Sequence, residues 1–109
     1  AVDLEEQDII EGMLEANRCG HVVCTQGGES IAGLRKAVAR GIISKNQPVV
    51  VDSTSHQLKF SNFQDMYFRN AFPPEYAVTP REALINKPVP MPASAEAIAS
   101  FLQLKKKST

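Results

Sequence analysis

Only two short apolar runs in this chain have the character of buried β-strands, and this small number constrains the fold more than any other feature. They occupy residues 21–24 (His-Val-Val-Cys) and 49–51 (Val-Val-Val). Between them, residues 29–40 have apolar positions at helical spacing and predict a helix that stops at Gly41. Strand, helix and strand in this order predict an α/β fold: a βαβ unit with two parallel strands and a right-handed crossover.

Helices are predicted on both sides of this unit. Residues 3–18 are amphipathic, with Asp3 as the predicted N-cap. Ser61 and Gln64 have the spacing of a capping box at the start of another helix. Ser94 is the predicted cap of a last helix. The residues expected to face inward from that helix are Ile98, Phe101 and Leu102, and its C-terminal end carries Lys105, Lys106 and Lys107.

Two parts of the chain differ in composition. Residues 1–60 hold the first helix and the βαβ unit, whereas residues 61–109 are predicted to be a helical and Pro-rich C-terminal extension that packs on it. Six of the seven prolines lie within residues 73–92. Two parallel strands do not make a stable sheet alone. We therefore expect the unit to dock on strands that this chain lacks, as a fragment of a larger α/β protein, and the absence of an initiator Met is compatible with this expectation.

The charge balance and the cysteine content narrow the classes of function. Twelve basic residues balance twelve acidic ones, which argues against a nucleic-acid or anionic-membrane partner. No apolar run approaches the roughly 18 residues that a bilayer crossing needs. Two cysteines are too few for a disulfide scaffold, so a reducing, intracellular setting is expected.

Two polar segments follow the predicted strands and are the first candidates for a binding site. Residues 25–28 (Thr-Gln-Gly-Gly) and 53–56 (Ser-Thr-Ser-His) would leave the same edge of a parallel sheet, where ligands of open α/β sheets bind. Gly27 and Gly28 would let backbone N–H groups approach a ligand at a helix N-terminus. The alternative is that the glycines only form a tight turn and the hydroxyls only cap helices.

Three other groups of residues are weaker candidates. Cys19, His21 and Cys24 lack a fourth metal ligand, and strand alternation would turn Cys24 away from the other two, so no metal site is predicted. A Cys24 nucleophile with His56 as its base is disfavoured, because an apolar run disfavours a thiolate. Lys59 is either a phosphate or carboxylate ligand or an ordinary surface residue.

Three segments resemble one enzyme family. Residues 21–34 (HVVCTQGGESIAGL) are similar to a late strand–loop–helix of the threonine synthase family, a group of fold-type-II (tryptophan synthase β-like) pyridoxal-phosphate enzymes. Residues 49–60 (VVVDSTSHQLKF) resemble the family's final strand, which typically ends Thr-Gly-His-Gly-Leu-Lys or Ser-Thr-Ala-His-Gly-Leu-Lys-Phe. Residues 88–99 resemble the proline-rich run and last helix that close many members. The three segments follow the family's order and span most of the chain.

This resemblance implies a C-terminal part of a larger three-layer α/β fold. The Schiff-base lysine and the glycine-rich cup for the cofactor phosphate would lie in an upstream part of the same enzyme. The chain alone is then expected to be inactive and to contain no catalytic residue. The whole enzyme would use pyridoxal phosphate to convert O-phospho-L-homoserine and water into L-threonine and phosphate. It would be a lyase of threonine biosynthesis in the cytoplasm, or in the plastid stroma of a plant, and whether it is a homo-oligomer stays open.

The same resemblance assigns roles to four residues. Thr54 would hydrogen-bond the pyridine nitrogen of the cofactor, because it matches the Thr of the family's Thr-x-His-x-Leu-Lys motif. A neutral hydroxyl there would tune how strongly the ring acts as an electron sink. Thr25, Gln26 and Gly27 would lie near the same ring, although their loop departs from the family's usual sequences.

Two non-enzymatic functions remain as alternatives. One is a small module that binds an anion or another ligand at Gly27 and Gly28. The other is a protein-interaction domain that uses the acidic first helix and the Pro-rich segment as partner surfaces.

Overall fold

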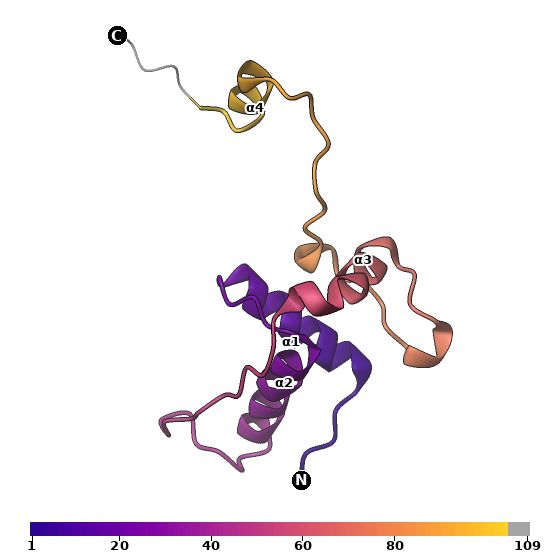
Figure 1. Cartoon of the computed structure of the whole chain (residues 1–109). Coiled ribbons are helices and arrows are strands. Elements are labelled where there is room, and N and C mark those ends of the chain that lie inside the picture. The colour runs from indigo at the N-terminus through magenta and orange to yellow at the C-terminus, as the bar shows by residue number, and fades with distance from the viewer. Residues whose placement is uncertain (105–109) are drawn as a thin grey trace.

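A computed structural model describes residues 1–104, and this part of the chain is helical (Figure 1). The α-helices are α1 (Glu6–Arg18), α2 (Thr25–Ala39), α3 (Ser61–Arg69) and α4 (Ala95–Phe101). The 3₁₀ turns are η1 (Gln57–Phe60), η2 (Pro74–Tyr76) and η3 (Glu82–Leu84).

The predicted α/β fold is wrong, because residues 1–104 contain no β-strand and no sheet. The two apolar runs are not parallel neighbours. Residues 49–51 have no regular structure and are exposed, with Val50 97% accessible. Residues 21–24 contribute one antiparallel bridge, from Val23 to His56. A strand needs a neighbouring strand to pair its backbone groups, and these two short runs supply too few pairs to form a ladder on their own.

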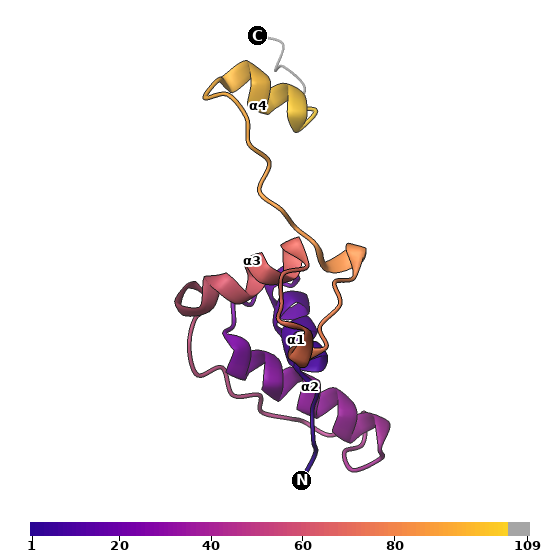
Figure 2. The ribbon, with the colours of Figure 1, turned by 90° about the vertical axis from the view of Figure 1, so that its right-hand side faces the viewer.

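The centre of the fold is the crossing of α1 and α2 (Figure 2), which depends on two glycines. A Cβ atom added to Gly12 would lie 2.6 Å from the carbonyl oxygen of Gly28. A Cβ atom on Gly28 would lie 2.8 Å from the backbone nitrogen of Met13 and closer still to the carbonyl oxygen of Ile9. The two backbones therefore approach more closely than any side chain at these positions would allow.

Both of these helices begin elsewhere than predicted. The N-cap of α1 is Glu5, whose backbone N–H donates to the Asp8 carboxylate over 3.3 Å, so the predicted cap at Asp3 is wrong. Asp3 instead accepts a hydrogen bond from Arg40 near the end of α2. The predicted turn at residues 25–28 is the first turn of α2, which starts four residues before the predicted Glu29. Its end before Gly41, whose φ of +71° suits glycine, is confirmed.

Helix α3 and the chain after it complete the core. Tyr67 and Phe68 are buried against α1, together with Val78 and Leu84 from the following segment. The predicted capping box at Ser61 is wrong, because the N-cap of α3 is Phe60 and no side chain caps the helix there. The main core residues are Ile10, Met13, Leu14, Ala16, Val23, Tyr67, Phe68, Val78 and Leu84.

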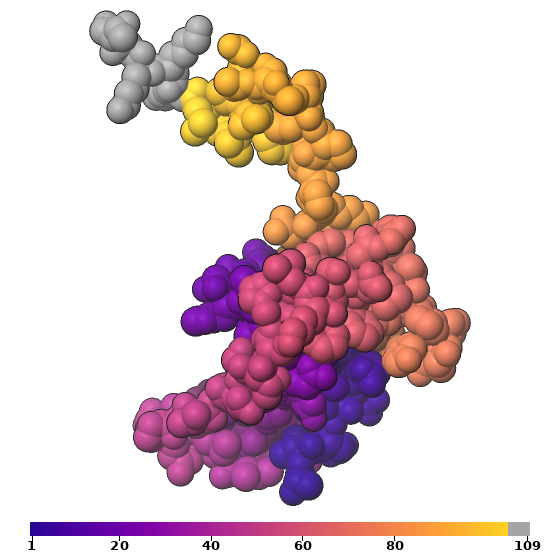
Figure 3. All heavy atoms as spheres, viewed as in Figure 1, coloured from indigo at the N-terminus to yellow at the C-terminus, as the bar shows by residue number. Residues whose placement is uncertain are grey.

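Helix α4 stands away from this core at the end of an extended arm (Figure 3). Its predicted cap is confirmed, since the Ser94 hydroxyl accepts the Ala97 N–H over 3.3 Å. The predicted inward face is wrong, because Ile98, Phe101 and Leu102 are 41%, 55% and 55% exposed. Lys105, Lys106 and Lys107 lie outside the described residues.

Candidate functional site

Two of the three segments that carry the family resemblance, residues 21–34 and 49–60, meet at the N-terminus of α2. The Sγ atom of Cys24 lies 3.6 Å from the Oγ1 atom of Thr54, and either atom can be the hydrogen-bond donor. The antiparallel bridge between Val23 and His56 holds the two segments together beside this contact. Their proximity was predicted, but the parallel sheet edge that was expected to produce it is absent from the described residues.

Cys24 occupies the N-cap of α2 and is completely buried. Burial raises the pKa of its thiol, but the nearby polar groups have the larger combined effect and the pKa is lowered overall. These groups are the Thr54 hydroxyl, which lies within hydrogen-bond distance of the sulfur, and the backbone at Gly27, Gln26 and Ser55. Cys24 makes no side-chain capping hydrogen bond to α2, so the first turn of the helix favours the thiolate through its positive electrostatic potential.

The predicted cofactor residues do not converge on one point. Thr54 is exposed and contacts Cys24. Gly27 is buried, and a Cβ atom added to it would lie 2.7 Å from the Cβ atom of Val23, so its lack of a side chain serves packing. Thr25 and Gln26 instead line a separate cavity of about 200 Å³.

That second site, which we call the aromatic cavity, was not predicted. It lies between the first turns of α1 and α2 and the loop after α3. Its walls include Phe63, Phe72 and Tyr76, and the acidic residues Glu6 and Glu29 also line it. Phe63 belongs to α3, where an apolar residue in a helix gives no specific signal for a binding site. Phe72 and Tyr76 belong to a loop without periodicity, so no local pattern could have placed them here.

Asn17 was also missed, although it joins both segments to α1. Its Oδ1 atom accepts the Val23 N–H over 3.1 Å, and its Nδ2 group donates to Oε1 of Gln57 over 2.7 Å. One side chain thus fixes the position of the bridge between Val23 and His56. The only sequence signal is an amide residue near the end of a predicted helix, which is too common to single it out.

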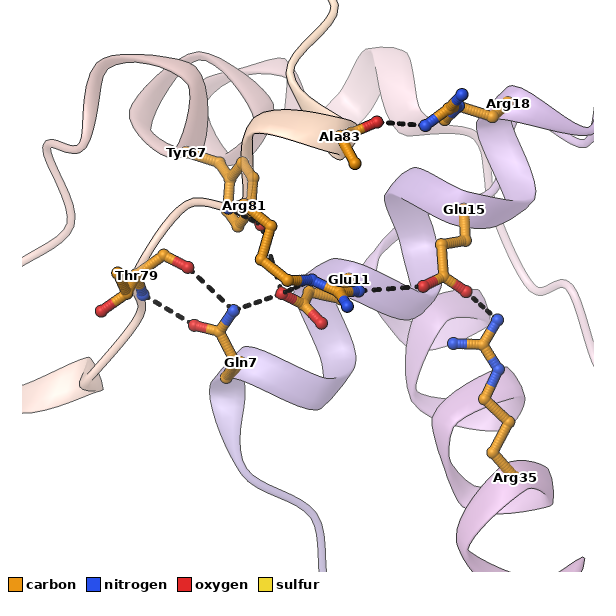
Figure 4. Close-up of polar contacts among 9 residues, drawn as sticks. All are labelled: Gln7, Glu11, Glu15, Arg18, Arg35, Tyr67, Thr79, Arg81 and Ala83. Atoms are coloured by element: carbon orange, nitrogen blue, oxygen red, sulfur yellow. Dashed lines mark hydrogen bonds and ion pairs between the residues drawn. The ribbon is translucent and has the colours of Figure 1, made fainter.

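A groove of about 970 Å³ runs beside this junction. Val22, Val51 and Leu84 line it, and Glu15, Arg35 and Arg81 provide polar lining. The arginines that line the groove form ion pairs or hydrogen bonds with other residues of the chain (Figure 4). Arg35 and Arg81 pair with Glu15, the latter over 3.1 Å, and Arg18 donates to the carbonyl oxygen of Ala83.

The described structure adds no support for the weaker candidate sites predicted from the sequence. Cys19 is exposed whereas Cys24 is buried, and residues 1–104 contain no group of three or more metal-ligating side chains. The Nδ1 atom of His56 accepts the Leu58 N–H over 3.1 Å, and no hydrogen bond between His56 and Cys24 is found in the described part of the chain. Lys59 is exposed at the end of η1.

Comparison with known protein families leaves the chain unassigned, since no family model matches the sequence. The longest described helix has 15 residues, and none of the helices up to residue 104 is both long and apolar enough to cross a membrane.

At the Cys24–Thr54 contact, Thr54 is the residue that would hold the ring nitrogen of pyridoxal phosphate. Thr54 is exposed, and its hydroxyl can donate to a ring nitrogen whenever the Cys24 thiol donates to it. The phosphate group is not fitted by Gly27 and Gly28, because both are buried in packing contacts. The part of the cofactor that residues 1–104 would hold is therefore its ring nitrogen and not its phosphate group.

Proposed function

We propose that this chain forms one wall of a cofactor site in a pyridoxal-phosphate enzyme similar to the threonine synthases. The enzyme would convert O-phospho-L-homoserine and water into L-threonine and phosphate, in the cytoplasm or the plastid stroma. An upstream part of the same enzyme would supply the Schiff-base lysine and the phosphate cup. The observation that carries this proposal is the 3.6 Å contact between Cys24 and Thr54, because it joins two of the three segments that resemble the family.

In this proposal Thr54 holds the cofactor ring and Cys24 positions Thr54. The bound cofactor supplies the electron sink for the reaction. Thr54 donates its single hydroxyl proton to the ring nitrogen, and the Cys24 thiol donates to the other side of the same oxygen. Ionisation of Cys24 would turn the sulfur into a competing acceptor for that proton, so ring binding and thiolate formation oppose each other.

Reading the coding sequence upstream of residue 1 is the first test. We expect an upstream cofactor domain with a Ser-Phe-Lys-Asp type of motif. A coding sequence that starts at residue 1 would overturn the proposal, since the chain would then lack the Schiff-base lysine.

The second test is kinetic and uses the intact protein with O-phospho-L-homoserine. Thr54→Val removes the donor and should lower kcat by roughly 10²-fold, measured as phosphate release. Thr54→Ser keeps the hydroxyl and should retain most of the activity. An unchanged kcat in Thr54→Val would remove Thr54 from the cofactor site.

The two non-enzymatic alternatives receive less support. A small-anion module would need accessible backbone at Gly27 and Gly28, but both residues are buried. An acidic interaction surface on α1 would need free carboxylates, but several of them pair within the chain. These pairs are Asp8 with Lys36, Glu11 with Arg81, and Glu15 with Arg35 and Arg81.

A further inference from the structure

The aromatic cavity combines two kinds of wall that proteins use together for one class of ligand. The rings of Phe72 and Tyr76 lie 6.2 Å apart at 68° and so form a corner. Phe63 stacks almost parallel to Phe72, at 6.2 Å and 9°, and extends one side of that corner. Aromatic faces attract cations that lie within about 6 Å of the ring centre, and rings set at an angle can contact one ammonium group together.

The charges that line the cavity are negative. Glu6 and Glu29 contribute carboxylates, and the residues that line the cavity include no lysine and no arginine. Both glutamates are exposed, and neither forms a salt bridge with another residue of the described chain. Two carboxylates without a cationic partner favour a positively charged ligand and disfavour a phosphate.

The N-terminus of α2 does not cancel the preference of the cavity for a positively charged ligand. A helix N-terminus presents unpaired N–H groups that repel cations. Here Cys24 at the N-cap and Gly27 in the first turn are both buried, and the residues of α2 that line the cavity are Thr25, Gln26 and Glu29. The first turn of α2 therefore contributes mainly the side chains of Thr25 and Gln26 to the cavity.

The loop that carries the aromatic corner is held in an uncommon conformation. Ala77, which directly follows Tyr76, has a φ of +51°, although alanine has no side-chain hydrogen bond to favour this region. Tyr76 remains 44% exposed, so its ring is open to a ligand instead of being covered by the core.

We propose that the aromatic cavity binds a small organic ammonium ion, with the charged group between the rings of Phe72 and Tyr76 and the carboxylates of Glu6 and Glu29. A cavity of about 200 Å³ admits a quaternary or primary ammonium on a short alkyl stem, but not a cofactor with a phosphate and an aromatic ring. This site lies apart from the Cys24–Thr54 contact and does not rest on the proposed enzymatic function.

Choline and its uncharged carbon isostere, dimethylbutanol, test the proposal with the full chain. Titration followed by the ring proton shifts of Phe72 and Tyr76 should give saturable binding of choline. The isostere should bind about 10-fold more weakly, because it fills the same space without the charge. Equal affinity for both compounds would reduce the site to an apolar depression, and no binding of choline would overturn the proposal.

Variants separate the two kinds of wall. Tyr76→Ala should weaken choline binding by about 10-fold, whereas Tyr76→Phe should stay within about 2-fold of the native chain, because both rings offer a π face. Glu6→Gln combined with Glu29→Gln should weaken choline binding by about 5-fold and leave the isostere unaffected. Glu82→Gln, in η3 and outside the cavity, is the matched control. Circular dichroism checks that each variant folds, and unchanged affinity in folded Tyr76→Ala would contradict the proposed site.

Discussion

At the scale of single residues, the pKa of Cys24 is subject to opposing effects. Complete burial raises the pKa of its thiol, whereas the nearby backbone at the N-terminus of α2 lowers it. The Thr54 hydroxyl adds a donor from a segment thirty residues away. The lowered pKa of Cys24 therefore depends on tertiary structure and reports whether the 53–56 segment is in place.

Replacing Thr54 by valine tests this dependence. Thr54→Val keeps the shape of the side chain but removes its donor, so the pKa of Cys24 should rise toward its ordinary value. The ultraviolet absorbance of the thiolate, followed against pH in a Cys19→Ser background, measures the change. Thr54→Ser retains the donor and should leave the titration close to that of the native chain, and an unshifted titration in Thr54→Val would show that the hydroxyl does not reach the sulfur.

The same pKa shift predicts how stability depends on pH. A thiol whose pKa is lowered by folding stabilises the folded chain fully above its ordinary value of 9.0, and this contribution is lost as the pH falls through the folded-state pKa. The free energy of unfolding of the Cys19→Ser chain, minus that of the same chain with Cys24→Ala, should therefore grow as the pH rises toward about 9. Urea unfolding over a pH series measures it, and a flat difference would contradict the lowered pKa.

At the scale of elements, the α1–α2 crossing depends on the absence of side chains. Gly12 and Gly28 lie at the crossing itself, where the nearest neighbours are backbone atoms that cannot move aside. Gly33 belongs to the same helix as Gly28, but an added Cβ atom would find only Leu4 Cδ1, at 4.0 Å. The crossing therefore requires glycine at position 28, whereas the open space at Gly33 would accept a side chain.

Alanine substitutions at Gly28 and Gly33 should have opposite effects on the free energy of unfolding. Gly28→Ala should lower the free energy of unfolding by about 1–3 kcal/mol or prevent folding, because it forces the two helix backbones apart. Gly33→Ala should raise it by roughly 0.5–1 kcal/mol, because alanine is the better helix former and the space is open. Thermal or urea unfolding of both variants provides the comparison, and a tolerated Gly28→Ala would contradict the close approach of the helices.

The elements also show what sequence reasoning could and could not predict. The helices were recognisable, since their apolar periodicity and the Ser94 cap are local properties. The strands at 21–24 and 49–51 were not correctly predicted, because a strand exists only with a partner and local apolar character does not supply one. The contact of Cys24 with Thr54 agrees with the predicted neighbourhood of the two segments, whereas the aromatic corner of Phe72 and Tyr76 depends on loop conformation.

At the scale of the whole molecule, one polar network joins parts that are distant in the sequence (Figure 4). Arg81 donates from Nε to Glu11 over 2.7 Å and pairs with Glu15 over 3.1 Å. Its backbone N–H donates to the Tyr67 hydroxyl over 2.8 Å. Gln7 exchanges two hydrogen bonds with the backbone of Thr79, over 2.9 and 2.7 Å. The segment between α3 and the arm is thus fastened to α1.

Removing the Arg81 side chain should loosen this segment. Arg81→Leu keeps an apolar stem but leaves Glu11, whose side chain is only 15% exposed, without its cationic partner. We expect a loss of about 1–2 kcal/mol in the free energy of unfolding and faster amide hydrogen exchange in residues 77–85. Arg69→Leu is the matched control, because the ion pair of Arg69 within residues 1–104 is with the exposed Asp65 in its own helix. Equal exchange in the two variants would show that the network does not hold the segment.

Tyr67 links α1, α3 and the Arg81 segment through one hydroxyl, and its ionisation should therefore destabilise the folded chain. The side chain is fully buried, and burial raises its pKa, as do the charge of Glu11 and its hydrogen bond, while the Arg81 N–H lowers it by less. The unfolded chain releases this proton near pH 10.0, whereas the folded chain retains it to higher pH, so the free energy of unfolding should fall as the pH rises above that value. Tyr67→Phe costs the chain the hydrogen bonds to Glu11 and from the Arg81 N–H but has no proton to lose, so its stability should decline less steeply in the alkaline range. Urea unfolding below and above about pH 10 measures both slopes, and parallel slopes would mean that Tyr67 titrates alike in the folded and unfolded chains.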